Sequence, residues 1–168
     1  IKDKYYAGRF KETVDDLTQF LTENTDLIAP DKWMDMLQES KFAYGKELYQ
    51  KGNLADSIVV LAEYMASFPD APHMDEADMI LSDAISREMD KFYLNKEFIK
   101  IITLYDQNTD NIINGGDQPF RDKVKSYTAF SLYKMGISEK ASTMLDSVEN
   151  KQNPYYLMTA IMLGRITE

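Results

Sequence analysis

A repeated segment constrains this chain more than any other feature of its sequence. Residues 8–21 and 52–65 superpose without a gap at a spacing of 44 residues, with a glycine at the head of each and apolar residues at matching places after it. The pattern returns 44 residues later at Lys96 and 40 residues after that at Gly136, and a short echo lies at Gly164. A period of this length predicts an array of equivalent units, each burying its apolar face against its neighbours.

Each unit reads as two amphipathic helices joined at a repeat marker, a name we use for Gly8, Gly52, Lys96, Gly136 and Gly164. Apolar residues recur three and four positions apart on both sides of the marker, as in a helix with one buried face, and glycine terminates helices well. Proline and carboxylates, which favour a first turn, begin three of the helices that precede a marker: Pro30 with Asp31, Pro72 with Asp75 and Glu76, Pro119 with Asp122. The pattern predicts helices at 1–7, 10–24, 30–51, 54–67, 73–94, 96–109, 119–135, 138–149 and 154–165.

Composition agrees with an all-α fold. The chain has only seven Gly and five Pro among its 168 residues, and Val is scarcer than Met, so backbone breakers and β-branched residues are few. The net charge of −9 argues against a nucleic-acid scaffold, because phosphate binding needs clustered cations. The chain has no cysteine, which excludes disulfides and thiolate sites. No apolar run approaches the roughly 18 residues of a membrane helix, so we expect no membrane span.

Residues 38–69 carry the small, aromatic and proline positions of one tetratricopeptide repeat (TPR): Tyr44-Gly45, Leu48, Gly52, Leu54, Ser57, Leu61 and Pro69. The chain thereby resembles TPR proteins. Two positions depart from the family pattern, since Ser57 stands where Ala is usual and Lys41 where Trp is frequent. The spacings of 44 and 40 residues also exceed the family's 34. The helix–Pro–Asp/Glu-Ala junction at residues 64–77 resembles that of bacterial periplasmic TPR proteins that serve envelope assembly.

The resemblance implies a right-handed α-solenoid (superhelix) of helix hairpins, whose concave side grips a peptide or protein, and it implies no reaction. We therefore expect a single TPR-like domain over 1–168, truncated at both ends, with units near 1–29, 30–70, 71–117, 118–152 and a partial unit at 153–168. The expected function is a non-enzymatic protein-interaction scaffold without a cofactor. The alternative is a permanently packed structural subunit of a bacterial envelope or motility assembly. The resemblance favours the periplasm or cell envelope over the cytoplasm.

A tyrosine stands three residues before four of the five markers, at Tyr5, Tyr49, Tyr93 and Tyr133, whereas the fifth unit has Ile161. Equivalent positions on stacked helices form a column, so we expect these rings along one side of the solenoid. The family places first helices on the concave wall, and the expected partner-binding residues are Phe42, Lys46, Tyr49, Asp90, Tyr93, Tyr127, Phe130 and Tyr133. Tyrosine suits recognition because its rigid ring buries area and keeps a hydroxyl. The alternative is that the tyrosines wedge neighbouring hairpins together.

Charge is unevenly distributed between the third and fourth units. Residues 70–90 hold seven carboxylates against one cation, Arg87: Asp70, Asp75, Glu76, Asp78, Asp83, Glu88 and Asp90. The first helix of the fourth unit is basic, with Arg121, Lys123, Lys125 and Lys134. Because corresponding helices of adjacent units are neighbours in a solenoid, we expect ion pairs between them. The alternative is an acidic patch that steers a basic partner.

The segment from Asp106 to Asp117 has the oxygen spacing of an EF-hand calcium loop. It departs from the motif at Asn111, where the loop needs Gly, and at Asp117, where a longer Glu binds the ion through both oxygens. A linker rich in turn formers explains the same residues. We expect the linker and no bound calcium.

His73 is the only histidine, and with Asp70, Asp75 and Glu76 it could imitate a metal or acid–base cluster. A metal site needs three or four convergent ligands, and the chain offers no other imidazole and no thiolate. We expect instead an exposed histidine at a helix start whose carboxylates cap free N–H groups. No catalytic residue is expected.

The last predicted helix is rich in Met and Tyr, with Met158 and Met162 beside Tyr155 and Tyr156. Met fills irregular cores and also lines adaptable binding surfaces. Because a second helix of the fifth unit should begin after Gly164, we expect part of this apolar surface to be an interface exposed by truncation.

Overall fold

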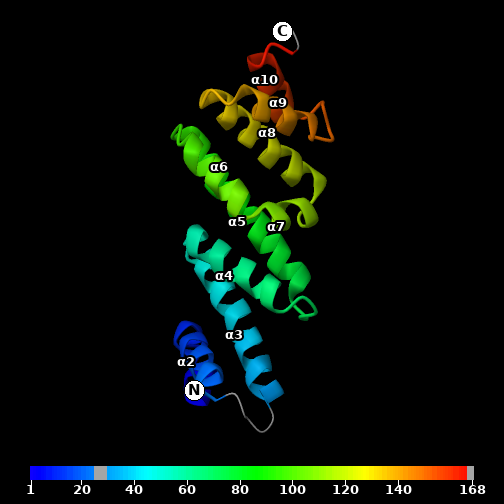
Figure 1. Ribbon diagram of the computed structural model, residues 1–168. Coiled ribbons are helices and arrows are strands. Elements are labelled where there is room, and N and C mark those ends of the chain that lie inside the picture. Colours follow the sequence, from blue (N-terminus) through cyan, green and yellow to red (C-terminus); the bar gives the residue numbers. More distant parts are fainter. Residues whose placement is uncertain (25–29, 166–168) are drawn as a thin grey trace. The chain divides into compact units, whose positions relative to one another are not determined.

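The computed structural model describes residues 1–24 and 30–165 (Figure 1). Every regular element in these two ranges is a helix, which confirms the all-α expectation. The helices are α1 (Lys2–Tyr6), α2 (Phe10–Glu23), α3 (Pro30–Gln50), α4 (Leu54–Ser67), α5 (Met74–Leu94), α6 (Phe98–Gln107), α7 (Thr109–Asn114), α8 (Gln118–Lys134), α9 (Ser138–Asp146) and α10 (Pro154–Met162). Within the described part of the chain, none of them has the length and apolar character needed to cross a membrane.

The chain divides into two compact parts, each larger than a single repeat. From here on we call Ile1–Leu81 unit 1 and Ser82–Glu168 unit 2. Helix α5 contributes its first turns to unit 1 and its remaining turns to unit 2. Each unit holds consecutive helix hairpins.

The five repeat markers share one backbone conformation. The φ angles are 71° at Gly8, 78° at Gly52, 59° at Lys96, 78° at Gly136 and 67° at Gly164, and Lys96 is the one non-glycine residue with positive φ in the described ranges. Each marker N–H donates to the carbonyl three residues before it, and the next N–H donates to the carbonyl four residues before the marker. These two bonds define the Schellman motif that ends many helices. The repeat seen in the sequence is therefore also a repeat of the backbone.

The second helix of each hairpin begins two residues after its marker, at Phe10, Leu54, Phe98 and Ser138. The four N-cap residues between marker and helix have φ from −97° to −82° and ψ from 58° to 64°. One turn geometry thus reverses the chain in four places.

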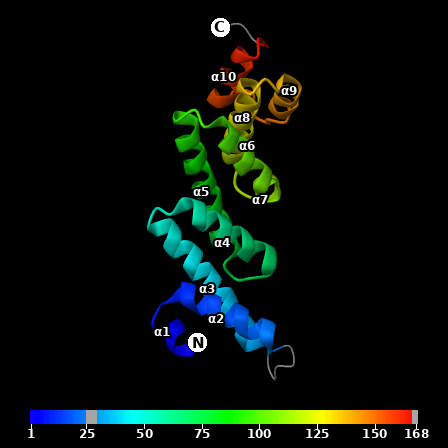
Figure 2. The ribbon, with the colours of Figure 1, turned by 60° about the vertical axis from the view of Figure 1, so that its left-hand side comes forward.

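In unit 1, α3 packs against both α2 and α4 (Figure 2). The core is formed by fully buried side chains such as Leu17, Leu61 and Tyr64. Gly45 allows the close approach of α3 and α4, because a Cβ at this position would lie 2.7 Å from the Leu61 side chain. The hydroxyl of Ser57 donates to the Gly45 carbonyl at 2.8 Å, so serine gives this contact a hydrogen bond that an alanine could not.

In unit 2, α8 is the central helix and contacts α6, α7, α9 and α10. Asp122, expected to act at the start of this helix, has a different role: its side chain is buried and accepts the backbone N–H groups of Glu149 (2.9 Å) and Asn150 (3.0 Å). The carboxylate therefore holds the loop after α9 against α8. The start of α8 is capped instead by Asp117, which accepts the Phe120 N–H at 2.9 Å.

The segment between α6 and α8 differs from the expected linker, because Thr109–Asn114 forms the short helix α7. Its Ile112 is fully buried. Burial of this side chain holds the short helix against the rest of unit 2. Several other helices end two or three residues earlier than their patterns predicted, including α9 and α10.

Candidate partner-binding surface

Four of the residues expected to contact a partner come together in unit 2. Asp90 and Tyr93 lie on α5, and Tyr127 and Phe130 lie on α8. The rings of Tyr93 and Tyr127 stack with centroids 4.4 Å apart and an interplanar angle of 8°, and Tyr93 lies 5.4 Å from the ring of Phe130. The aromatic spacing of the two helices thus produces direct ring contact between consecutive hairpins.

Asp90 organises the polar part of this cluster. Its Oδ1 accepts the Tyr127 hydroxyl at 3.1 Å, and its Oδ2 accepts Lys123 Nζ at 2.7 Å. Lys123 also donates to Ser86 Oγ at 2.8 Å, and only 13% of its side chain is exposed against 42% for Asp90. Burial, followed by the negative charge of Asp90, raises the pKa of Tyr127. The phenol therefore stays protonated and keeps donating to the carboxylate.

Helix α10 completes the cluster with two residues that sequence reasoning had not assigned to it. The ring of Tyr155 meets Tyr127 edge-on at 5.0 Å, and Lys123 Nζ lies 5.7 Å from the Tyr155 centroid. The Tyr93 hydroxyl donates to Met158 Sδ at 3.2 Å, and burial raises the pKa of Tyr93. Tyr155 and Met158 are three residues apart, which puts them on one helix face. This spacing was the sequence signal that could have assigned them to the cluster.

The cluster has a buried layer and an exposed layer. Tyr127 and Phe130 are only 6% and 5% exposed and support the others. Tyr133, one turn further along α8, is half-buried, and Lys134 Nζ lies 6.0 Å from its ring. Four residues keep part of their surface in solvent, and we call them the aromatic-acidic surface: Asp90, Tyr93, Tyr155 and Met158.

Unit 1 holds the remaining expected residues. Phe42 is buried, and its ring stacks on the imidazole of His73 with centroids 4.5 Å apart. Lys46 Nζ lies 5.8 Å from the Phe42 centroid and forms an ion pair with Glu76 at 2.6 Å. Tyr49, at the end of the same helix, is half-buried. Phe42 therefore lies beneath charged side chains and presents little surface of its own.

His73 differs from the exposed residue expected at a helix start. It precedes α5, its side chain is half-buried on Phe42, and its Nε2 lies 3.3 Å from Glu39 Oε2. The signal for this contact was weak, because Phe42 lies 31 positions earlier in the chain. Within the described ranges, no three residues of the types His, Cys, Asp and Glu are placed to hold a metal ion.

The expected pairing of the acidic and basic helices is confirmed by Lys123 and Asp90. The other cations of α8 have different partners. Arg121 lies 4.0 Å from Glu149, while Lys125 Nζ donates to the backbone carbonyl of Ser147 at 3.0 Å. The cations of α8 therefore interact both with α5 and with the segment after α9.

Comparison of the chain with models of protein families, with curated proteins and with solved structures finds no match. The aromatic-acidic surface offers two phenol rings, a thioether and a carboxylate, held by packing from below. These groups are suited to contact with another chain.

Proposed function

We propose that the chain is a non-enzymatic scaffold that binds a peptide or protein partner on the aromatic-acidic surface. We further propose that its hairpins form a right-handed TPR-like α-solenoid, as the sequence resemblance implies. The common geometry of the five marker turns supports a repeated architecture. The resemblance to periplasmic TPR proteins favours a place in the bacterial envelope.

The observation that carries the proposal is the fixed position of the two partly exposed rings, Tyr93 and Tyr155. Tyr93 is held by stacking on Tyr127 and by its hydrogen bond to Met158, and Tyr155 is held by its edge contact with Tyr127. Side chains that are already ordered lose little entropy when a partner binds. Asp90 places an exposed carboxylate beside them, and the net charge of −9 attracts a cationic partner. The surface therefore fits a peptide with a basic residue next to apolar ones.

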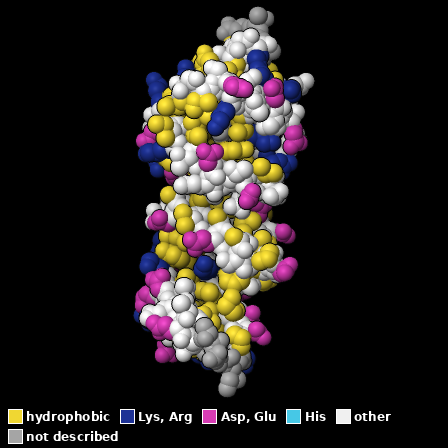
Figure 3. All heavy atoms as spheres, viewed as in Figure 1, with side chains coloured by type: hydrophobic (Ala, Val, Ile, Leu, Met, Phe, Trp, Pro, Cys, Tyr) yellow, Lys and Arg dark blue, Asp and Glu magenta, His cyan; other side chains and the backbone are white. Residues whose placement is uncertain are grey.

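A second candidate function, the permanently packed structural subunit, is favoured by large apolar side chains in solvent. In unit 1, Val59 is 57% and Met79 72% exposed, and in unit 2, Ile99 is 63% and Leu94 78% exposed. Figure 3 shows hydrophobic side chains reaching the surface between charged ones on one face. Permanent assemblies cover such residues with large apolar interfaces.

Peptide display on the purified chain tests the scaffold proposal. Selected peptides should lose affinity by about tenfold or more on Tyr155→Ala and on Asp90→Asn, since each removes an exposed contact. Val59→Ala, on the exposed face of α4, is the matched control and should leave affinity unchanged. Peptides that bind all three variants equally would contradict the proposed surface. A stable oligomer in light scattering, with no selectable peptide, would favour the structural subunit.

A further inference from the structure

Unit 2 contains a cavity of about 800 Å³ on a different side of α8 from the aromatic-acidic surface. It lies between α6 and α9, with α8 as its floor. Its walls are largely apolar and include Ile102, Ile113, Ile137 and Met144. Ile113 and Ile137 are 52% and 42% exposed, so apolar surface at this cavity is open to solvent.

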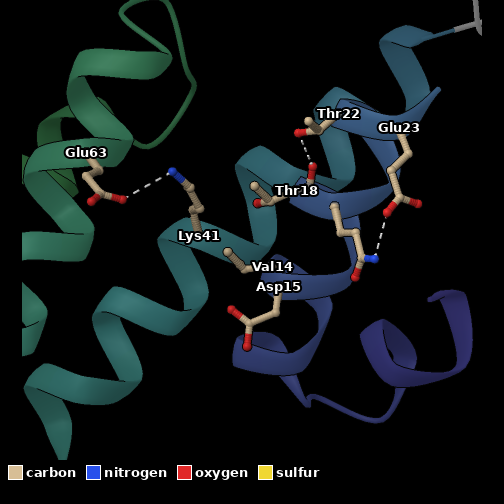
Figure 4. Close-up of a pocket in the computed structure, with 8 residues that line it drawn as sticks. Val14, Asp15, Thr18, Thr22, Glu23, Lys41 and Glu63 are labelled. Atoms are coloured by element: carbon tan, nitrogen blue, oxygen red, sulfur yellow. Dashed lines mark hydrogen bonds and ion pairs between the residues drawn. The ribbon is translucent and has the colours of Figure 1, made fainter. Parts of the chain in front are cut away.

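Unit 1 has a cavity of about 530 Å³ at the same place in the repeat, between α2 and α4 with α3 as its floor (Figure 4). Val14 and Ile102 each stand six residues after a marker. Lys41 and Lys125 each stand eleven residues before a marker, and each lines its cavity. The two cavities are therefore equivalent, and their chemistry can be compared position by position.

The partner of the lysine differs between the two cavities. Lys41 Nζ lies 3.4 Å from Glu63 Oε2, and Figure 4 shows the two side chains pointing toward each other. The position equivalent to Glu63 in unit 2 is Ser147, and Lys125 Nζ donates only to its backbone carbonyl. No carboxylate among the described residues lies within ion-pairing distance of Lys125. The ammonium that is ion-paired in unit 1 therefore has no ion-pair partner among the described residues of unit 2.

The net charge of the lining residues changes in the same direction. Lys140 lines the unit 2 cavity four residues after its marker, where unit 1 has Asp56 outside its cavity lining. The unit 1 cavity is lined by three carboxylates and one lysine, whereas the unit 2 cavity is lined by two carboxylates and two lysines. The two carboxylates in unit 2, Asp106 and Glu139, are both exposed, where solvent weakens their repulsion of an anion.

We propose that the unit 2 cavity binds a small amphipathic carboxylic acid. Its carboxylate accepts a charge-assisted hydrogen bond from Lys125, in the place that Glu63 fills in unit 1. Its alkyl chain lies on Ile102, Ile113 and Met144 and removes their apolar surface from water. The cavity volume lies within the range of roughly 300–1,000 Å³ typical of small-molecule sites.

Titration of the full chain with sodium decanoate, below its micellar concentration, tests the site by calorimetry and by NMR of the Ile and Met methyl groups. We expect saturable binding with shifts at Ile102, Ile113 and Met144. Lys125→Met, which keeps the apolar stem, should weaken binding by about tenfold or more. Lys41→Met at the equivalent place in unit 1 is the matched control and should leave affinity unchanged. Decan-1-ol, which lacks the charge, should bind Lys125→Met and the native chain alike.

Ser147→Glu provides a second variant that keeps Lys125 and so tests the site even if Lys125→Met fails to fold. The new carboxylate reproduces the unit 1 pair and should weaken decanoate binding by about tenfold. Absence of saturable binding, methyl shifts that map to other residues, or unchanged affinity in Ser147→Glu would each overturn the proposal.

Discussion

The ring of Tyr93 on α5 lies parallel to the ring of Tyr127 on α8, with an interplanar angle of 8°. Tyr93 is the third of four tyrosines that precede repeat markers, and its ring joins two consecutive hairpins of unit 2. The same side chain contacts α10 through Met158. Tyr93 thus both packs neighbouring hairpins and presents part of its surface to solvent, so its substitution can measure how much each role contributes.

We expect Tyr93→Ala to lower the free energy of unfolding by about 3 kcal/mol, because it removes the stack on Tyr127, the contact with Phe130 and the hydrogen bond to Met158. Tyr133→Ala is the control at the equivalent place in the next hairpin. Its ring contact is with Lys134 at 6.0 Å, so we expect a loss of about 1 kcal/mol. Urea denaturation measures both. A loss below about 1 kcal/mol in Tyr93→Ala would instead support a role in partner contact alone.

The fold should lose stability above pH 10, and Tyr127 should account for part of the loss. Burial and the charge of Asp90 raise the pKa of Tyr127 in the folded chain above its ordinary value. The unfolded chain therefore releases this proton first, so the stability contribution is complete below pH 10 and declines as pH rises. Each such proton lowers the free energy of unfolding by about 1.4 kcal/mol per pH unit above the unfolded pKa.

Tyr127→Phe keeps the ring and removes the titrating hydroxyl, so its free energy of unfolding should fall less steeply than that of the native chain between pH 10 and 11. The difference between the two slopes measures the contribution of the Tyr127 hydroxyl. Urea denaturation at a series of pH values gives the slopes. An equal slope in Tyr127→Phe and the native chain would be inconsistent with the raised pKa.

Removal of the Asp122 carboxylate should lower the free energy of unfolding more than removal of an exposed carboxylate does. Both of its oxygens accept backbone N–H groups of the loop after α9, and the residue is 1% exposed. Asp122→Ala leaves the Glu149 and Asn150 donors without this partner, and we expect a loss of about 3 kcal/mol. Asp122→Asn keeps one acceptor oxygen and should lose about half as much. Asp146→Ala, which removes an exposed pair with Arg165, should cost less than about 1 kcal/mol.

Much of the fold could be predicted from the sequence because its signals are local. The spacing of Gly8, Gly52 and Gly136 and the apolar period around them depend on residues close together in the chain, and they correctly gave the hairpin turns. Helix α7 could not be predicted in this way. Four of its six residues are polar, and its stability depends on burial of Ile112 by neighbouring helices.

The surface was harder to predict than the fold because burial depends on tertiary contacts. The sequence places Tyr127 and Asp90 on adjacent first helices, and the structure brings them together. It does not reveal that Tyr155 and Met158 of α10 would cover the same cluster. The sequence also places Asp122 near a helix start. It gives no sign that the carboxylate accepts backbone N–H groups of Glu149 and Asn150 in the loop after α9.

Lys96 offers a test of the marker turn itself. Its φ of 59° lies in the left-handed region, which the other four markers reach with glycine. A side chain in this region costs about 1–2 kcal/mol, whereas glycine adopts it without steric penalty but loses more entropy on folding. Lys96→Gly should therefore raise the free energy of unfolding by about 0.5–1 kcal/mol. The reverse change, Gly136→Lys, places a side chain at φ 78° with no atom within 4 Å of its Cβ, so it should lower stability by about 1 kcal/mol through backbone strain alone. Thermal and urea denaturation measure both variants. A destabilised Lys96→Gly would mean that the lysine side chain contributes more to the third hairpin than its backbone strain costs.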